Sequence, residues 1–256
     1  MRRSKIMTCM AVISAAVVTL SGAYWQWRLT PLKHVQVQST NVPTVFVAGD
    51  YAKAFSTNGF VHRLSATHLM TRALMVHVAK NGHISVKQFA PLRHNPTIQV
   101  VFADNHHSKR QARQLATVMH LLNQRYHVQQ FNAVGHSSGG NIIFDYLTAN
   151  HQDAQPRIQR FVSIGTNYPN AEIQLKRLPQ QTKILNIAGQ IWRTSGDGEV
   201  QLKGILAFSK LLNAHHFEVQ TKIIHGNPLR TEHSMLHINP TVDAQLVSFL
   251  YGTSNS

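Results

Sequence analysis

The stretch Phe131-Asn-Ala-Val-Gly-His-Ser-Ser-Gly-Gly140 decides the fold. Apolar residues lead directly into the pattern Gly-x-Ser-x-Gly, and helical spacing follows, so the sequence predicts a strand, a sharp turn and a helix. A Cβ on Gly135 or Gly139 would collide with the neighbouring strand or helix at such a turn. The turn raises the hydroxyl of Ser137 above the carboxyl end of a sheet. Because the helix dipole and the backbone N–H of Ser138 can stabilise an oxyanion there, we expect Ser137 to be a nucleophile.

A nucleophilic serine needs a base to take its proton and a carboxylate to orient that base. In a strand–turn–helix setting of this kind, the chain order is Ser, then Asp or Glu, then His. The chain has only ten acidic residues, and most of them fall on predicted helices, strands or connections. The loop Ser195-Gly-Asp-Gly-Glu-Val200 leaves Asp197 and Glu199 as candidates. We choose Asp197, because the glycines on both sides let it turn toward the sheet; the alternative is an ordinary Asp-Gly turn.

The base is expected between the last predicted strand and the last predicted helix. His233 and His237 both lie there, in Glu232-His-Ser-Met-Leu-His-Ile-Asn-Pro240. We choose His233 as the base and assign His237 a packing or supporting role. The alternative for either is a surface histidine in a chain that has 17 of them. The histidine pairs in the chain are adjacent and cannot share one helix face, so no metal site is predicted.

The second donor to the oxyanion is expected from the loop after the first core strand, Gly49-Asp50-Tyr51. The backbone N–H of Asp50 is the candidate, with its acidic side chain pointing away. The connection from Gly165 to Gln181, where a cap is often inserted, is short. The sequence therefore predicts a small cap or none, and an open site.

Apolar runs and helical periods organise the remainder of the chain as an α/β protein. Strands alternate with helices, which favours a mostly parallel sheet covered by helices on both faces. A hairpin with an Asn81-Gly82 turn precedes the central strands. The expected strands are 42–48, 74–78, 84–89, 97–102, 158–164, 183–188 and 217–224, and the expected flanking helices are 108–126 and 242–251. In the last helix, Asp243 is expected as a charge near the N-terminus.

The N-terminus predicts export from the cytoplasm. Arg2, Arg3 and Lys5 precede a charge-free run from Ile6 to Trp27, which is long enough to span a bilayer. The basic residues before the run place the body outside the cytoplasm. We favour an uncleaved anchor in residues 1–27 over a cleaved signal, followed by a polar linker in residues 28–41 and one domain in residues 42–256. The single cysteine of the chain lies inside the anchor, so the body holds no disulfide.

The chain carries a formal net charge of +15. Its Lys and Arg residues are scattered singly, without a basic helix or an aromatic–basic repeat, which argues against a nucleic-acid partner. An anionic membrane or cell-wall surface is the partner that this charge favours.

Taken together, these segments resemble the α/β-hydrolase superfamily, and more narrowly the poorly characterised cell-surface hydrolases of Gram-positive bacteria. The resemblance spans about residues 42–251. It implies an α/β-hydrolase fold with Ser137 as nucleophile, Asp197 as acid and His233 as base. The chain departs from the pattern in having Ala48-Gly49 where relatives have His-Gly, and an extra glycine in Ser195-Gly-Asp197.

The leading interpretation is an exported serine hydrolase that cleaves a small-molecule or lipid ester through an acyl-enzyme and needs no cofactor. One alternative is a catalytically weak or inactive hydrolase fold that acts as a cell-envelope binding module. Another is a peptidase or acyltransferase that uses the same three residues, because the machinery for these reactions is shared.

Overall fold

The structure is a computed structural model that describes residues 2–49, 54–151 and 154–252; for residues 54–56 and most of 2–14 only the backbone is described. Within these ranges, eight strands form one sheet in the order β3-β2-β4-β1-β5-β6-β7-β8. The strands are β1 (Thr44–Val47), β2 (Thr71–Val78), β3 (Ile84–Gln88), β4 (Pro96–Phe102), β5 (Gln130–His136), β6 (Arg157–Ile164), β7 (Lys183–Ile191) and β8 (Val219–Gly226). Neighbouring strands are parallel except for β3, which pairs antiparallel with β2 at one edge. The predicted mostly parallel sheet is confirmed.

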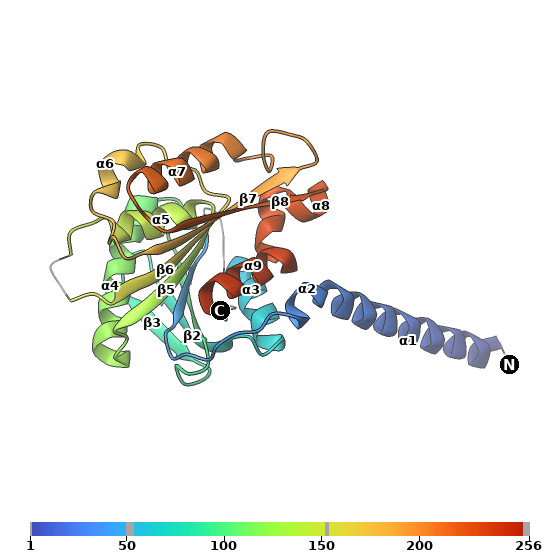
Figure 1. The fold of residues 1–256 in the computed structure, drawn as a ribbon. Helices are drawn as coiled ribbons and strands as arrows, with labels where there is room; N and C mark the ends of the chain where they lie inside the picture. Colours follow the sequence, from blue (N-terminus) through green and yellow to red (C-terminus); the bar gives the residue numbers. More distant parts are fainter. Residues whose placement is uncertain (1, 50–53, 152–153, 253–256) are drawn as a thin grey trace.

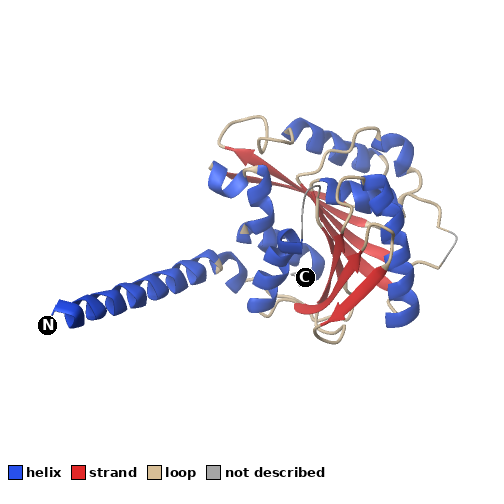
Figure 2. Ribbon diagram, turned by 180° about the vertical axis from the view of Figure 1, so that it is seen from behind, coloured by secondary structure: helices blue, strands red, loops and turns tan. Residues whose placement is uncertain are grey.

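Helices cover both faces of this sheet (Figures 1 and 2). The helices are α1 (Arg2–Arg28), α2 (Thr30–Lys33), α3 (Ala54–Ala66), α4 (Ser108–Tyr126), α5 (Ser138–Leu147), α6 (Ala171–Leu175), α7 (Leu202–Ala214), α8 (Pro228–Thr231) and α9 (Pro240–Tyr251), with a 3₁₀ helix η1 (His233–Ile238). Helices α4, α5 and α7 cover one face, and α3 and α9 cover the other. The connection between β6 and β7 carries only the five-residue α6, so the cap is small, as the sequence predicted.

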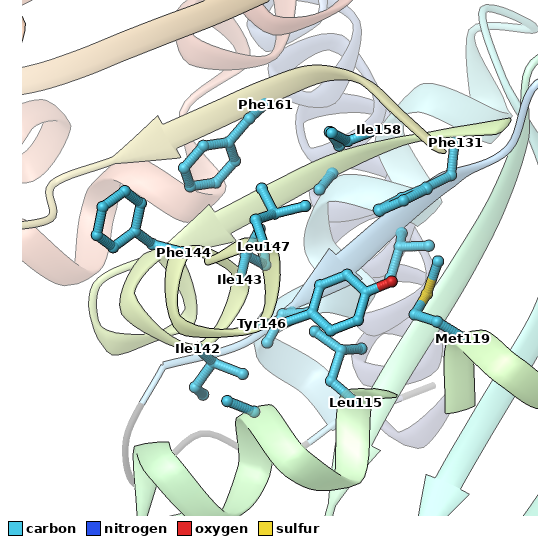
Figure 3. Packing of buried hydrophobic residues seen from close by; sticks show 14 of the residues in the cluster. Leu115, Met119, Phe131, Ile142, Ile143, Phe144, Tyr146, Leu147, Ile158 and Phe161 are labelled. Carbon is cyan, nitrogen blue, oxygen red and sulfur yellow. The ribbon is translucent and has the colours of Figure 1, made fainter. Parts of the chain in front are cut away.

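Two apolar cores result, one on each face. Successive strand residues point to opposite faces, so Val45 and Val47 in β1 enter one core while Phe46 enters the other. Figure 3 shows the first core, where α5 packs between α4 and the strands β5 and β6. This packing fixes α5 on the sheet and with it the turn at its N-terminus.

The sequence did not indicate every element. Helices α3 and α7 were not predicted, and residues 28–41 hold more structure than a polar linker would. Leu29 and Leu32 are buried in the core under α9, and Val37 bridges to Gly252. These residues join the folded body to α1, which projects from it as a single helix (Figure 1).

Among the residues that the structure describes, no helix is both long and apolar enough to cross a membrane. Part of the run from Ile6 to Trp27 lies outside the described side chains. The membrane anchor therefore stays a prediction.

Candidate active site

Ser137 lies at the tip of a strained turn between β5 and α5. Its backbone angles are φ 56° and ψ −134°, in the positive-φ region that residues with a side chain seldom adopt. A Cβ on Gly135 would come within 2.5 Å of Gly140 N, and a Cβ on Gly139 would collide with the carbonyl of Val47. The two glycines therefore do what the sequence predicted of them. The strained serine at this position is the geometry of a nucleophile elbow.

The neighbouring strand β6 holds the turn in place. Ser137 N donates a hydrogen bond of 2.9 Å to the carbonyl of Ile164, where β6 ends. The hydroxyl of Thr166 donates to the carbonyl of Ser137 at 2.8 Å. Both backbone polar groups of the strained residue are thus anchored, so the turn does not depend on substrate to form.

Asp197 and His233 meet in the interior, although 36 positions separate them in sequence. Asp197 follows β7 and is fully buried, and His233 begins η1 and is 4% exposed. His233 Nδ1 donates to Asp197 Oδ2 at 2.8 Å. The other carboxylate oxygen, Oδ1, accepts the backbone N–H groups of Glu199 at 3.0 Å and Val200 at 2.7 Å. The glycine-flanked loop therefore turns its carboxylate inward and fixes the imidazole by its Nδ1.

The opposite ring nitrogen, His233 Nε2, is buried and makes no hydrogen bond within the described residues. The exposed carboxylate of Glu199 is 3.6 Å away from it. Burial alone would lower the pKa of His233, but the hydrogen bond and charge of Asp197, with the charges of Glu199 and Glu232, outweigh it and raise that pKa. An imidazole with Nδ1 held and Nε2 free has the form of a general base.

His136, the residue directly before the serine, packs against this imidazole. Its ring centroid is 4.8 Å from that of His233, and its Nε2 donates to the backbone carbonyl of His233 at 2.9 Å. Burial and the neighbouring histidines lower the pKa of His136 to about 3, so it is neutral. This contact brings His233 beside the elbow, because His136 and Ser137 are consecutive.

His237 also packs near His136, and the centroids of the two rings are 5.4 Å apart. Burial, followed by the charge of Arg63, lowers its pKa. The guanidinium of Arg63 donates to the carbonyl of His237 and forms a buried ion pair with Asp243. Asp243 is therefore a partner of Arg63 in the core, and not simply the helix-end charge that the sequence predicted.

Of the two expected oxyanion donors, Ser138 lies within the described residues and Asp50 does not. Ser138 begins α5, and a Cβ on Gly49 would lie 3.4 Å from Ser138 N and 2.9 Å from the Cβ of Ser137. The loop after β1 thus approaches the elbow at Gly49. Asp50, the second predicted donor, lies outside the described residues. Two small cavities of about 10 Å³ each reach Gly49, and His136 and His237 line one of them.

The segments that carry Gly49, Ser137, Asp197 and His233 follow the carboxyl ends of β1, β5, β7 and β8 in that order, where open α/β sheets bind ligands. The roles of His136 and Thr166 were not evident from the sequence. The only signal for His136 was its place inside Gly-x-Ser-x-Gly, and Thr166 gave none, because both act through contacts between distant segments. Among the described residues, no group of three or more His, Cys, Asp or Glu side chains could hold a metal ion.

Comparisons with known proteins agree with this architecture. Residues 32–176 and 170–253 match the family described as "Alpha/beta hydrolase of unknown function (DUF915)". No protein among those with curated descriptions matches the chain. This chain belongs to that α/β-hydrolase family, as its motifs predicted.

Many solved structures are similar in fold, and three of them illustrate the similarity. A gene product from Listeria innocua has a TM-score of 0.70 at 20% identity, covering 82% of this chain and 93% of its own. A "putative cell surface hydrolase" from Lactobacillus plantarum has a TM-score of 0.64 at 23% identity, covering 82% and 89%. A carboxyl esterase from Bacillus coagulans has a TM-score of 0.52 at 12% identity, covering 84% and 91%. At these identities the similarity shows the fold.

Proposed function

We propose that this protein is an exported serine hydrolase that cleaves an acyl ester through an acyl-enzyme on Ser137. The observation that carries the proposal is the buried Asp197–His233 pair, which leaves His233 Nε2 without a hydrogen bond within the described residues. His233 also packs on His136, the residue directly before the strained Ser137. A surface histidine would lack the buried carboxylate, and an ordinary turn would not force Ser137 to a positive φ.

In the proposed reaction, the hydroxyl of Ser137 attacks the ester carbonyl while His233 Nε2 takes the hydroxyl proton. Asp197 keeps the imidazole in the tautomer that has Nδ1–H and stabilises the cation that forms. The protonated His233 then gives its proton to the leaving alcohol. Water then attacks the acyl carbon and gives a proton to Nε2. As the bond between the acyl carbon and Ser137 Oγ breaks, Nε2 passes that proton to Oγ and the acid leaves, so the enzyme returns to its starting state.

Charge on the carbonyl oxygen would be held by the backbone N–H groups of Ser138 and Asp50. Each such donor contributes about 3–4 kcal/mol to the transition state in serine hydrolases. The approach of Gly49 to Ser138 N supports a shared oxyanion site at this point. A small α6 in place of a cap supports an open site for small or surface-borne esters.

We also propose that residues 1–27 anchor the protein with its body outside the cytoplasm. Arg2, Arg3 and Lys5 before an uncharged run from Ile6 support that orientation. The positive charge of the body suits an anionic membrane or cell-wall surface, which would concentrate the enzyme near its substrate. The similar Lactobacillus protein is described as a "putative cell surface hydrolase", which agrees with this location.

The decisive experiment is labelling of the full chain with a fluorophosphonate probe, alongside hydrolysis of nitrophenyl esters of increasing acyl length. We expect labelling at Ser137, and loss of labelling and turnover in Ser137→Ala without loss of the fold. His233→Ala should reduce kcat by several orders of magnitude and His237→Ala much less. If Ser137→Ala keeps its activity, the nucleophile is wrong; if the two histidine variants are reversed, His237 is the base.

The same test separates the alternatives. A cell-envelope binding module would not be labelled, although its fold and charge would be the same. A peptidase or acyltransferase would be labelled at Ser137 but would prefer an amide substrate or an acceptor other than water. No observation favours these alternatives over ester hydrolysis.

A further inference from the structure

A groove of about 700 Å³ lies between the end of α1 and the outer face of α3, on the side of the protein from which α1 projects (Figure 1). Trp25 and Arg28 of α1 form one wall, His62 and Arg63 of α3 form another, and Arg72 of β2 contributes to the lining. The groove is separate from the proposed active site, because none of Ser137, Asp197 and His233 lines it.

The groove is positively charged. Three arginines line it, and none of its lining residues is Asp or Glu. The buried partner Asp243 neutralises Arg63. Arg28 uses one N–H to donate to the carbonyl of Ile238 at 2.8 Å, but it has no carboxylate partner among the described residues. Burial raises the pKa of Asp243 and the charge of Arg28, like that of Arg63, opposes this rise, but that carboxylate is already paired with Arg63. Within the described residues, two positive charges therefore remain uncompensated at the groove, which His62 also lines.

The surroundings of the Arg72 guanidinium favour binding of an anion more clearly than those of Arg28. Its guanidinium lies over the ring of Phe89, with its central carbon 4.0 Å from the ring centroid. Its Nε is buried and has no hydrogen-bond partner within the described part of the chain. Leaving a buried donor of a charged group without a partner is costly. A planar guanidinium held in this way suits a phosphate, which accepts two parallel N–H groups.

The position of the groove indicates where such a phosphate would come from. Tyr24, Trp25 and Trp27 cluster at the same end of α1, and aromatic side chains of this kind mark the level of lipid headgroups. Before them, Val18 and Leu20 are 72% and 70% exposed, which leaves apolar surface uncovered by protein. The 27-residue α1 is about 40 Å long and exceeds the hydrocarbon thickness of a bilayer.

We propose that this groove binds the phosphate headgroup of an anionic glycerophospholipid, with Arg72 and Arg28 as its cationic ligands. The proposal rests on the proposed anchoring of α1, because the bilayer then brings the headgroup to the groove. Bound lipid would hold the folded body in one orientation on the membrane. Its acyl chains would lie along exposed apolar side chains of α1, such as Val18 and Leu20.

The test uses the full chain in micelles of a neutral detergent and measures the midpoint of thermal unfolding. Three additives are compared: dihexanoyl phosphatidylglycerol, dihexanoyl phosphatidylcholine and inorganic phosphate. We expect saturating phosphatidylglycerol to raise the midpoint by about 5 °C or more, and the other two to leave it nearly unchanged. An equal rise with phosphatidylcholine would overturn the proposal in favour of apolar contact, and an equal rise with inorganic phosphate would show a free-phosphate site.

Variants assign the effect to the groove. Arg72→Gln should abolish the rise, and Arg72→Lys should retain part of it. Arg125→Gln is the matched control, because Arg125 also lies beside an aromatic ring but is exposed on α4, on the other side of the sheet. Hydrolysis of a soluble nitrophenyl ester should be unchanged in Arg72→Gln. If that variant does not fold, Arg28→Gln must weaken the rise; a full rise in a folded groove variant overturns the assignment.

A separate measurement distinguishes failure of the anchor from failure of the groove. Membranes from cells that express the full chain are washed with alkaline carbonate. Retention of the protein in the membrane supports the anchor, and release overturns it. The response to phosphatidylglycerol in micelles does not depend on that outcome, so the two proposals can fail independently.

Discussion

Asp197 and His233 are joined by two hydrogen bonds, one between their side chains and one between their backbones. His233 Nδ1 donates to Asp197 Oδ2 at 2.8 Å, and His233 N donates to the carbonyl of Asp197 at 2.9 Å. The backbone bond sets the distance between the loop after β7 and η1. The side-chain bond then fixes the direction of the imidazole, so the two residues form one rigid unit.

Replacing Asp197 by asparagine tests that unit. Asn has the same shape, but its amide no longer requires Nδ1 to carry the proton, so the ring can adopt the wrong tautomer. We expect kcat for ester hydrolysis to fall by about 10⁴-fold with little change in KM. Glu218→Gln, which removes an exposed carboxylate directly before β8, is the control and should be near wild type. A loss below tenfold in Asp197→Asn would show that another carboxylate orients the base.

The raised pKa of His233 predicts the pH dependence of activity. The base must be neutral, so kcat/KM should fall as pH drops through a pKa above the ordinary histidine value. The carboxylate of Glu199, 3.6 Å from Nε2, helps to raise that pKa. Glu199→Gln should therefore shift the acid limb to lower pH. A shift in the opposite direction, measured over pH 4–9, would contradict His233 as the titrating base.

His136 should contribute through the position of His233 and not through its own charge. His136→Phe keeps a ring against His233 but loses the 2.9 Å hydrogen bond to its carbonyl. We expect kcat to fall about fivefold, because one net hydrogen bond is worth about 1 kcal/mol. His136→Gln, whose amide can donate, should recover part of the loss. Since the pKa of His136 is about 3, neither variant should add or remove a limb of the pH profile above pH 5.

His120→Phe provides the matched control for that experiment. Its imidazole also lies within hydrogen-bond distance of a backbone carbonyl, that of Ala154 at 3.3 Å, but on α4, remote from the site. The His120→Phe variant should leave kcat for ester hydrolysis unchanged. Equal losses in the two variants would mean that His136 acts on general stability and not on the base.

The elbow and the central strands could be predicted from the sequence because their signals are local. Gly135 is required by steric contacts with Gly139 and Gly140 within the same turn. Gly139 is required by a contact with distant Val47, but the local pattern Gly-x-Ser-x-Gly marks it all the same. Strand β5 is a compact apolar run. Helix α3 gave no such signal, since Gly59 interrupts it and its helical pattern is weak. The ion pair of Arg63 and Asp243 spans 180 positions and could not be found without the fold. For the same reason the contact of His136 with His233 was missed, whereas the order Ser, Asp, His was predicted.

Residues 28–33 should be required for stability although they precede the predicted domain. Leu29 and Leu32 are 4% and 2% exposed in the core beneath α9. Each buried leucine contributes about 1.5–3 kcal/mol, so a chain beginning at residue 34 should lose about 3–6 kcal/mol relative to one beginning at residue 28. Urea unfolding of the two fragments measures the difference. Leu32→Ala in the longer fragment should give part of the loss, and equal stability of both fragments would contradict the packing.

The fragment beginning at Arg28 also allows the charge of the body to be tested without α1. It loses the positive charges of Arg2, Arg3 and Lys5 and no acidic residue, so a formal net charge of +12 remains. We expect it to co-sediment with anionic vesicles at low salt and to be released at about 0.5 M salt, where the screening length falls to a few ångströms. Neutral vesicles are the control and should not retain it. If the fragment stays on the vesicles at about 0.5 M salt, apolar contact holds it there. If it does not co-sediment at low salt, its positive surface does not recognise anionic lipid.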